Sequence, residues 1–213
     1  LYSMEYSGDY GLEAFIDQGG GSSDMAVAGF VIDRLFHGVV NLDLQGSPFG
    51  CSTLSISAPD GARLFGRNFD WGACATLIVQ TRPRNGYASI STVNMDFLNL
   101  GLDLSEETSV RLMSAAAPYA PMDGINEKGL CVAVLMIEDR PGFDQNTEKP
   151  DLTTTTAVRL LPDKAASVDE ALDLLRQEDL HASAGMMVHF AIADTSGCSV
   201  AVEYVNNEMS VVE

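Results

Sequence analysis

The sequence has 213 residues, of which 46% are hydrophobic, so it can form one large domain or two small ones with a sizeable core. Its net charge is −18, and it contains only 12 Lys and Arg residues. Binding to a nucleic acid backbone needs clusters of Lys and Arg, so this composition argues against a nucleic acid partner. No run of about 18 apolar residues occurs, so no membrane span is predicted.

The first 50 residues differ in texture from the rest. Residues 1–21 are polar and rich in glycine, which predicts a loop or flexible joint. The segment 23–37 predicts a helix, with Ser or Asp at its start and Gly38 after its end. Because the sequence begins with Leu1 rather than Met, one interpretation is a bacterial, extracytoplasmic protein from which an N-terminal signal has been removed.

From residue 51 onward the pattern is typical of strands. The stretches CSTLSIS and ARLFG predict a hairpin around the turn APDG, and TLIVQTRP, YASISTVNM and GLCVAVLMIED predict further strands. Two helices are predicted at TTTTAVRLL and SVDEALDLLRQ, followed by the strands VHFAIAD and CSVAVEY. Strands, then helices, then strands joined by short turns indicate an α+β fold with mainly antiparallel sheets.

The four cysteines lie at positions 51, 74, 131 and 198, and none forms a C-x-x-C pair. Neither a metal site nor a cofactor is therefore predicted, and disulfides are left open. A cysteine in a strand is most often a small apolar core residue, so any chemical role for Cys51 needs further support.

A nucleophilic Cys51 would need a base that takes the proton of its thiol. The candidate histidines His37, His181 and His189 lack the context of a catalytic triad, and each is expected to be structural. Cleavage of the Gly50–Cys51 bond would supply another base, a free α-amino group that titrates close to neutral pH. Glycine before the cysteine tolerates unusual backbone angles and leaves the scissile carbonyl unobstructed.

Arg67 and Asp70 lie on the return strand of the predicted hairpin, which would bring them beside Cys51. Arg67 could stabilise a thiolate by its positive charge, and Asp70 could hold the new ammonium group by a charge-assisted hydrogen bond. The alternative interpretation is a surface ion pair at the end of a strand.

The motifs CSTLSI, DGARLFGRNFDW and DGINEKGL, in this order, resemble the choloylglycine hydrolase family of linear amide C–N hydrolases, within the N-terminal-nucleophile superfamily. The resemblance extends from Cys51 to about Val212 and includes HFAIADTSGCSVAVEY. It implies a four-layered αββα sandwich in residues 51–213, with residues 1–50 as a propeptide that self-cleavage after Gly50 separates. Cys51 would be the nucleophile, and Arg67 and Asp70 match the family's arginine and aspartate.

Two departures from the family pattern accompany this resemblance. Met136 stands near the position of an Asn in bile salt hydrolases and a Tyr in some penicillin acylases, and only its backbone N–H could serve an oxyanion. The family domain continues beyond Glu213 with a Thr-Asn motif and a later arginine. The sequence-based expectation is therefore an incomplete fold, completed by a further C-terminal segment or a second chain.

The resemblance implies hydrolysis of an N-acylated small molecule of the penicillin V, conjugated bile salt or N-acyl amine class. Phe97, Leu98, Leu100, Met136 and Phe143 are predicted to line an apolar acyl pocket, and for any one of them ordinary core packing is the simpler interpretation. The alternative function is a non-catalytic binding or structural domain on the same scaffold, or a precursor that stays unprocessed. A homo-oligomer is left open.

Overall fold

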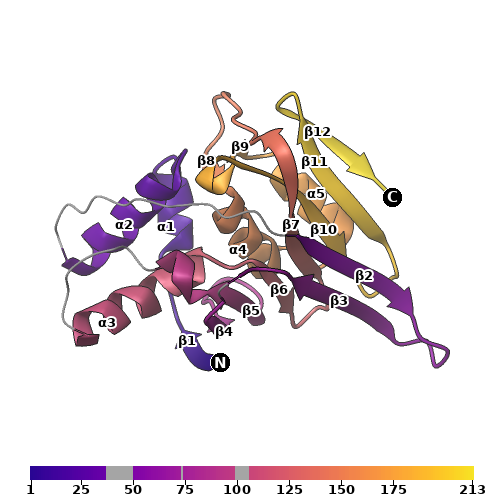
Figure 1. The fold of residues 1–213 in the computed structure, drawn as a ribbon, viewed down its shortest axis with the longest axis horizontal. Coiled ribbons are helices and arrows are strands. Elements are labelled where there is room, and N and C mark those ends of the chain that lie inside the picture. Colours follow the sequence, from indigo (N-terminus) through magenta and orange to yellow (C-terminus); the bar gives the residue numbers. More distant parts are fainter. Residues whose placement is uncertain (37–49, 73, 99–105) are drawn as a thin grey trace.

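The computed structural model describes residues 1–36, 50–72, 74–98 and 106–213 (Figure 1). The strands in the described part are β1 Tyr2–Ser7, β2 Cys51–Ser57, β3 Arg63–Phe69, β4 Thr76–Arg82, β5 Ser89–Asn94, β6 Asp123–Asn126, β7 Cys131–Pro141, β8 Asp151–Thr153, β9 Asp179–His181, β10 Met186–Ala193, β11 Ser199–Val205 and β12 Glu208–Val212. The α-helices are α1 Leu12–Asp17, α2 Asp24–Phe36, α3 Glu106–Ala116, α4 Thr154–Lys164 and α5 Val168–Leu175, and the short 3-10 helices are η1 Met95–Leu98, η2 Ala117–Tyr119 and η3 Ser183–Gly185.

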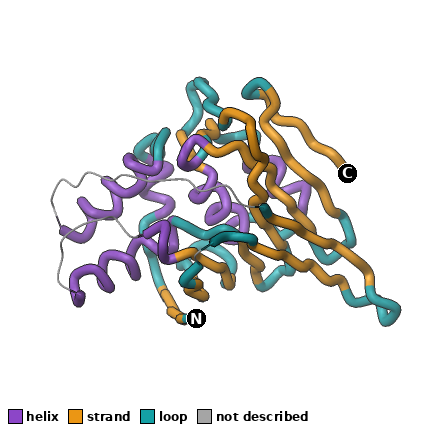
Figure 2. The backbone as a smooth tube through the Cα atoms, in the orientation of Figure 1, coloured by secondary structure: helices purple, strands orange, loops and turns teal. Residues whose placement is uncertain are grey.

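Eight strands form one large sheet in the order β1-β4-β5-β6-β7-β10-β11-β12. Every neighbouring pair in this sheet is antiparallel except β1 with β4, which run parallel. In Figure 2 the strands are orange, and short teal turns join several neighbouring strands of the sheet. The predicted α+β class with mainly antiparallel sheets is confirmed, and β12 adds an edge strand that the sequence pattern did not indicate.

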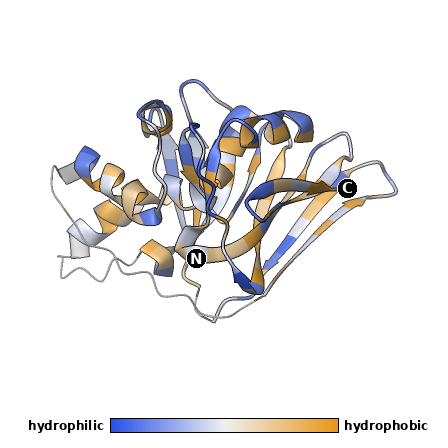
Figure 3. Ribbon diagram, turned by 90° about the horizontal axis from the view of Figure 1, so that it is seen from above, coloured by the Kyte–Doolittle hydropathy of each residue, from blue (hydrophilic) through white to orange (hydrophobic). Residues whose placement is uncertain are grey.

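Helices α4 and α5 cover one face of the large sheet (Figure 1). Both have an apolar side that packs into the main core, where Leu161, Leu172 and Phe190 are among the buried residues. Helix α5 begins where predicted, because the Ser167 hydroxyl accepts a hydrogen bond from the Glu170 N–H at 3.2 Å. In Figure 3 the hydrophobic colour gathers on the sheet and on the helix sides that face it.

The hairpin of β2 and β3 lies over the opposite face of the large sheet, across β6 and β7 (Figures 1 and 3). Helices, large sheet and hairpin therefore form successive layers. The hairpin closes as the sequence predicts, because Gly61 adopts a positive φ of 86° and the Asp60 carboxylate accepts the Ala62 N–H at 3.0 Å.

The N-terminal segment is not the loop or flexible joint predicted for residues 1–21. Its first residues form β1, at the edge of the large sheet, and α1 follows directly. Tyr10, Leu12 and Phe15 are buried in the same core as α4 and α5. The polar, glycine-rich composition did not predict these elements, because an edge strand and a helix of one or two turns contain too few apolar residues to give a clear hydrophobic pattern. In the described part of the chain, no helix is both long enough and apolar enough to cross a membrane.

Candidate active site

The backbone of the hairpin brings Cys51 beside the end of its own return strand. Cys51 is the first residue of β2 and lies opposite Phe69 of β3. One residue further out, the Asp70 N–H donates a hydrogen bond of 2.9 Å to the carbonyl oxygen of Gly50. The carbonyl that precedes Cys51 is therefore held by a backbone donor, and the thiol is half-buried.

Arg67 points from β3 to the thiol of Cys51. Its Nη2 donates to Cys51 Sγ at 3.9 Å and to the Val134 carbonyl oxygen at 3.1 Å. The guanidinium also lies 4.7 Å from the centre of the Phe69 ring. Only 8% of the Arg67 side chain is exposed, so solvent screens the positive charge of its guanidinium weakly.

Asp123 balances this charge, and it is not among the site residues predicted from the sequence. Its Oδ2 lies 3.1 Å from Arg67 Nη1, while its Oδ1 accepts the backbone N–H and the hydroxyl of Thr92 at 3.1 and 2.7 Å. The available signal was an acidic residue opening the DGINEKGL motif at the start of a predicted buried region. The partner of that residue could not be read from the chain, because Arg67 lies 56 positions away.

The rest of the same motif is structural. The Asn126 side-chain amide donates to the carbonyl oxygens of Pro162 and Ala165 at 2.9 and 2.7 Å, and it thereby caps the C-terminal end of α4. The Asn126 side-chain oxygen accepts the N–H groups of Lys128 and Leu130 at 3.0 Å each. The motif thus joins the helix layer to the strand that carries Asp123.

Asp70 sits at the mouth of the site and is exposed. Its Oδ1 accepts a 2.6 Å hydrogen bond from the Asn68 side chain. A Cβ atom placed on Gly50 would lie 4.0 Å from Asp70 Oδ2, so the carboxylate stands next to the backbone that precedes Cys51. The structure therefore brings Cys51, Arg67 and Asp70 together.

The residues predicted to line an acyl pocket are more dispersed than Cys51, Arg67 and Asp70. Phe97 lies in η1 and meets the Trp71 ring edge-on at 5.1 Å, and Trp71 stacks on Phe69 at 5.6 Å, so Phe97 borders the hairpin. Met136 lies in β7 opposite Val188, on the same strand as the carbonyl that binds Arg67.

Leu98 and Phe143 are core residues. Leu98 is buried with Leu77 and Val93, and Phe143 packs its ring 4.9 Å from the Tyr204 ring. Core packing is the interpretation that the burial of Leu98 and Phe143 supports, and Leu100 lies outside the described residues.

The remaining cysteines and histidines lie elsewhere. All four cysteines are free, and burial raises the pKa of the Cys131 thiol to about 11. His189 pairs with Glu203 at 3.2 Å on the large sheet. His181 belongs to β9, and His37 lies outside the described residues.

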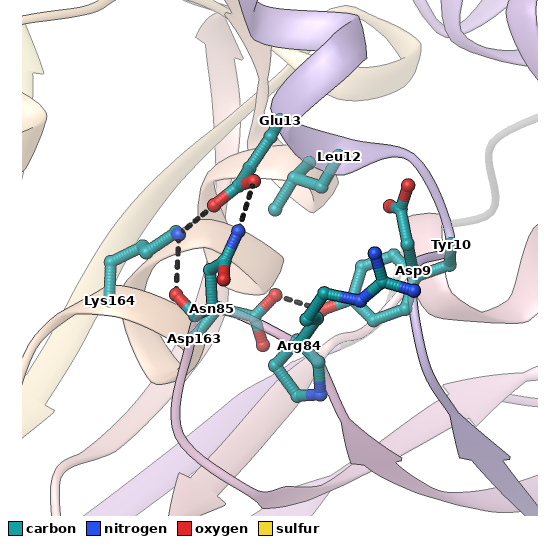
Figure 4. Close-up of a pocket in the computed structure, with 9 residues that line it drawn as sticks. Asp9, Tyr10, Leu12, Glu13, Arg84, Asn85, Asp163 and Lys164 are labelled. Atoms are coloured by element: carbon teal, nitrogen blue, oxygen red, sulfur yellow. Dashed lines mark hydrogen bonds and ion pairs between the residues drawn. The ribbon is translucent and has the colours of Figure 1, made fainter.

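A separate cavity of about 250 Å³ lies where the N-terminal segment meets the end of α4 (Figure 4). Its lining includes Asp163, which accepts a hydrogen bond from the Tyr10 hydroxyl and pairs with the buried Arg159 at 2.7 Å. Burial raises the pKa of Asp163. Glu13 pairs with Lys164 at the rim, so polar contacts as well as apolar burial join residues 9–13 to α4.

Comparisons with known proteins identify related sequences and related folds. The model of the linear amide C–N hydrolases, choloylglycine hydrolase family, matches residues 51–213. Over 99 residues, 42% of this chain and 26% of the other protein, the sequence is 29% identical to the penicillin V acylase of Pectobacterium atrosepticum.

Crystal structures of two variants of conjugated bile acid hydrolase from Clostridium perfringens share the fold. Their TM-scores are 0.54 and 0.53, and both are 21% identical in sequence. The matches cover 75% and 76% of this chain but only 49% and 50% of the hydrolase. This chain therefore spans about half the length of those structures, and the predicted N-terminal-nucleophile hydrolase fold is confirmed for that part.

Proposed function

Because the chain belongs to the choloylglycine hydrolase family of linear amide C–N hydrolases, we propose that it cleaves the C–N amide bond of an N-acylated small molecule with Cys51 as nucleophile. The observation that carries this proposal is the pair of contacts at the start of β2. The Arg67 guanidinium reaches the thiol at 3.9 Å, and a backbone N–H holds the preceding carbonyl at 2.9 Å.

The first step of the proposal is self-cleavage after Gly50. Cys51 Sγ attacks the carbonyl carbon of Gly50, and the C–N bond breaks as the Cys51 nitrogen takes up a proton and becomes an amine. Water then hydrolyses the thioester and leaves a carboxylate on Gly50. The Asp70 N–H supports this step, because it donates to the oxygen on which negative charge develops.

In the processed form, the free α-amine of Cys51 takes the proton of the thiol. The thiolate attacks the amide carbonyl of the substrate, and the α-ammonium returns the proton to the departing amine. Water hydrolyses the acyl-thioester, which releases the acid and restores the thiol. Arg67 stabilises the thiolate, and Asp70 holds the ammonium group beside the site of cleavage.

The substrate classes that the relatives suggest are penicillin V and conjugated bile acids, with N-acyl amines as a third class. Phe97 and Trp71 offer an aromatic surface beside the end of the hairpin and suit an apolar acyl group. We propose further that residues 1–50 are a propeptide, which self-cleavage separates covalently from Cys51. Their strand and buried side chains favour retention after the cut rather than release.

Intact-mass measurement of the purified protein tests the first step. We expect two fragments that separate at Gly50–Cys51 in the wild type and one uncut chain in Cys51→Ala. Cys74→Ala is the matched control, because Cys74 is also a free cysteine but is exposed and lies outside the hairpin. A wild-type protein that hydrolyses amides while residues 50 and 51 remain joined would refute the mechanism.

The activity is tested on the full gene product with penicillin V, glycine-conjugated bile acids and fatty-acyl amides. We expect release of the free acid from at least one class, and its loss in Cys51→Ala. A processed protein that hydrolyses no member of the panel would favour the alternative of a binding domain on the same scaffold.

A further inference from the structure

We propose that Asp151, Asp179 and His181 form a binding site for a divalent transition-metal cation, with Asp144 as the residue that orients the histidine. The three ligand atoms all lie within 4.8 Å of one another. They come from the two-stranded sheet of β8 and β9. This sheet lies apart from the β2–β3 hairpin that carries Cys51 (Figure 1).

The two separations that involve His181 match the edge of a tetrahedral cation site. His181 Nε2 lies 3.3 Å from Asp151 Oδ1 and 3.3 Å from Asp179 Oδ1. Zinc bonds to imidazole nitrogen and carboxylate oxygen are about 2.0–2.1 Å long, so the edge of the coordination tetrahedron is about 3.3 Å. A cation can therefore bind to these atoms with little movement of the side chains.

The buried carboxylate of Asp179 is incompletely hydrogen-bonded. Only 1% of its side chain is exposed, and among the described residues its Oδ1 accepts no hydrogen bond and has an ion-pair contact with His181 Nε2 at 3.3 Å. The other oxygen is already taken by the Thr147 N–H. A buried carboxylate oxygen without a donor is costly, and a cation facing it would remove that cost.

The histidine is oriented for metal binding. Asp144 Oδ1 lies 2.6 Å from His181 Nδ1, so this carboxylate can accept the Nδ1 proton and leave Nε2 facing the two other carboxylates. Such a carboxylate–histidine contact is the usual support behind a metal-binding imidazole. The side chain of Asp151 is 35% exposed, so a water molecule can complete the coordination.

The backbone around these residues is held firmly. Asp151 exchanges two backbone hydrogen bonds with the N-terminal segment, from Gly21 N–H at 2.9 Å and to the Gly19 carbonyl at 2.8 Å. The site therefore forms between β8, β9 and residues 19–21, and none of these belongs to the proposed catalytic machinery. Imidazole together with carboxylates favours Zn²⁺ or a similar ion over Mg²⁺.

The test adds Zn²⁺ or Co²⁺ to protein first treated with a chelator. We expect one Zn²⁺ per chain, a melting temperature raised by about 5–10 °C at 100 times the Kd, and a visible absorption band of tetrahedral Co²⁺. Asp179→Asn and His181→Gln should abolish these effects, and Asp144→Asn should weaken binding about 10- to 100-fold.

His189→Gln is the matched control and should bind Zn²⁺ as the wild type does, because His189 pairs with a single glutamate on the large sheet. The Co²⁺ spectrum and the stoichiometry of the wild type decide the proposal even where a variant fails to fold. Absence of stoichiometric binding by the wild type, or equal binding by folded Asp179→Asn, would overturn it. In that case His181 is an imidazolium held by its carboxylates.

Discussion

Replacing Asp123 by asparagine removes the negative charge opposite Arg67 but keeps the shape of the side chain. The side chain of Arg67 is 8% exposed and that of Asp123 is 19% exposed, and Arg67 Nη1 lies 3.1 Å from Asp123 Oδ2. At an effective dielectric constant of about 20, unit charges about 4 Å apart attract by about 4 kcal/mol. Part of this attraction is offset because the neutral amide costs less to bury than the carboxylate.

We therefore expect the Asp123→Asn variant to lose about 3 kcal/mol of unfolding free energy, which in urea lowers the transition midpoint by about 1 M. The matched control is Glu5→Gln, which breaks the Glu5–Arg82 pair at 3.3 Å on the surface, where the side chains are 57% and 65% exposed. A pair of that exposure contributes less than about 1 kcal/mol. Equal midpoints for the two variants would show that burial does not strengthen the Asp123–Arg67 pair.

The same substitution tests the proposed site. Asp123 touches Arg67 and not the thiol, so it acts as a positioning residue. Because displacement of a catalytic group by about 1 Å can cost about 100-fold, we expect kcat to fall 10- to 100-fold while KM changes little. A variant that is destabilised but cleaves substrate at the wild-type rate would contradict this prediction, because Asp123 would then contribute to folding and not to catalysis.

Three further outcomes follow from burial. Asp163→Asn should lose about 3–5 kcal/mol of unfolding free energy, because the fully buried Arg159 keeps its hydrogen bond to Ser89 but loses its carboxylate partner. Asp173→Asn on the exposed side of α5 should change little, and equal losses in urea denaturation would contradict this. At pH 8, iodoacetamide should label Cys131 far more slowly than the exposed cysteines by peptide mass spectrometry, since its pKa of about 11 leaves about 0.1% as thiolate. Phe15→Ala should cost about 3–5 kcal/mol and release residues 1–50 from cleaved protein on gel filtration, whereas the cleaved wild type should elute as one species.

The sequence by itself determined most local elements from residue 51 onward and the hairpin that carries Cys51. The alternating strand residues, the APDG turn and the pattern after Gly50 require only near neighbours, and β2, β3 and the proximity of Arg67 to Cys51 follow from them. The helix start at Ser167 was equally readable, because a cap acts within one turn.

The tertiary structure alone decided which distant groups meet. Asp123 reaches Arg67, Asp163 reaches Tyr10 and Asp144 reaches His181 across separations of 56, 153 and 37 residues. It also made the glycine-rich N-terminal segment a strand and a helix of the same core, against its local composition. Which residues become buried, and which charged groups meet, depends on how the layers of the fold pack together. The local sequence pattern does not specify which faces of the helices and sheets will be in contact.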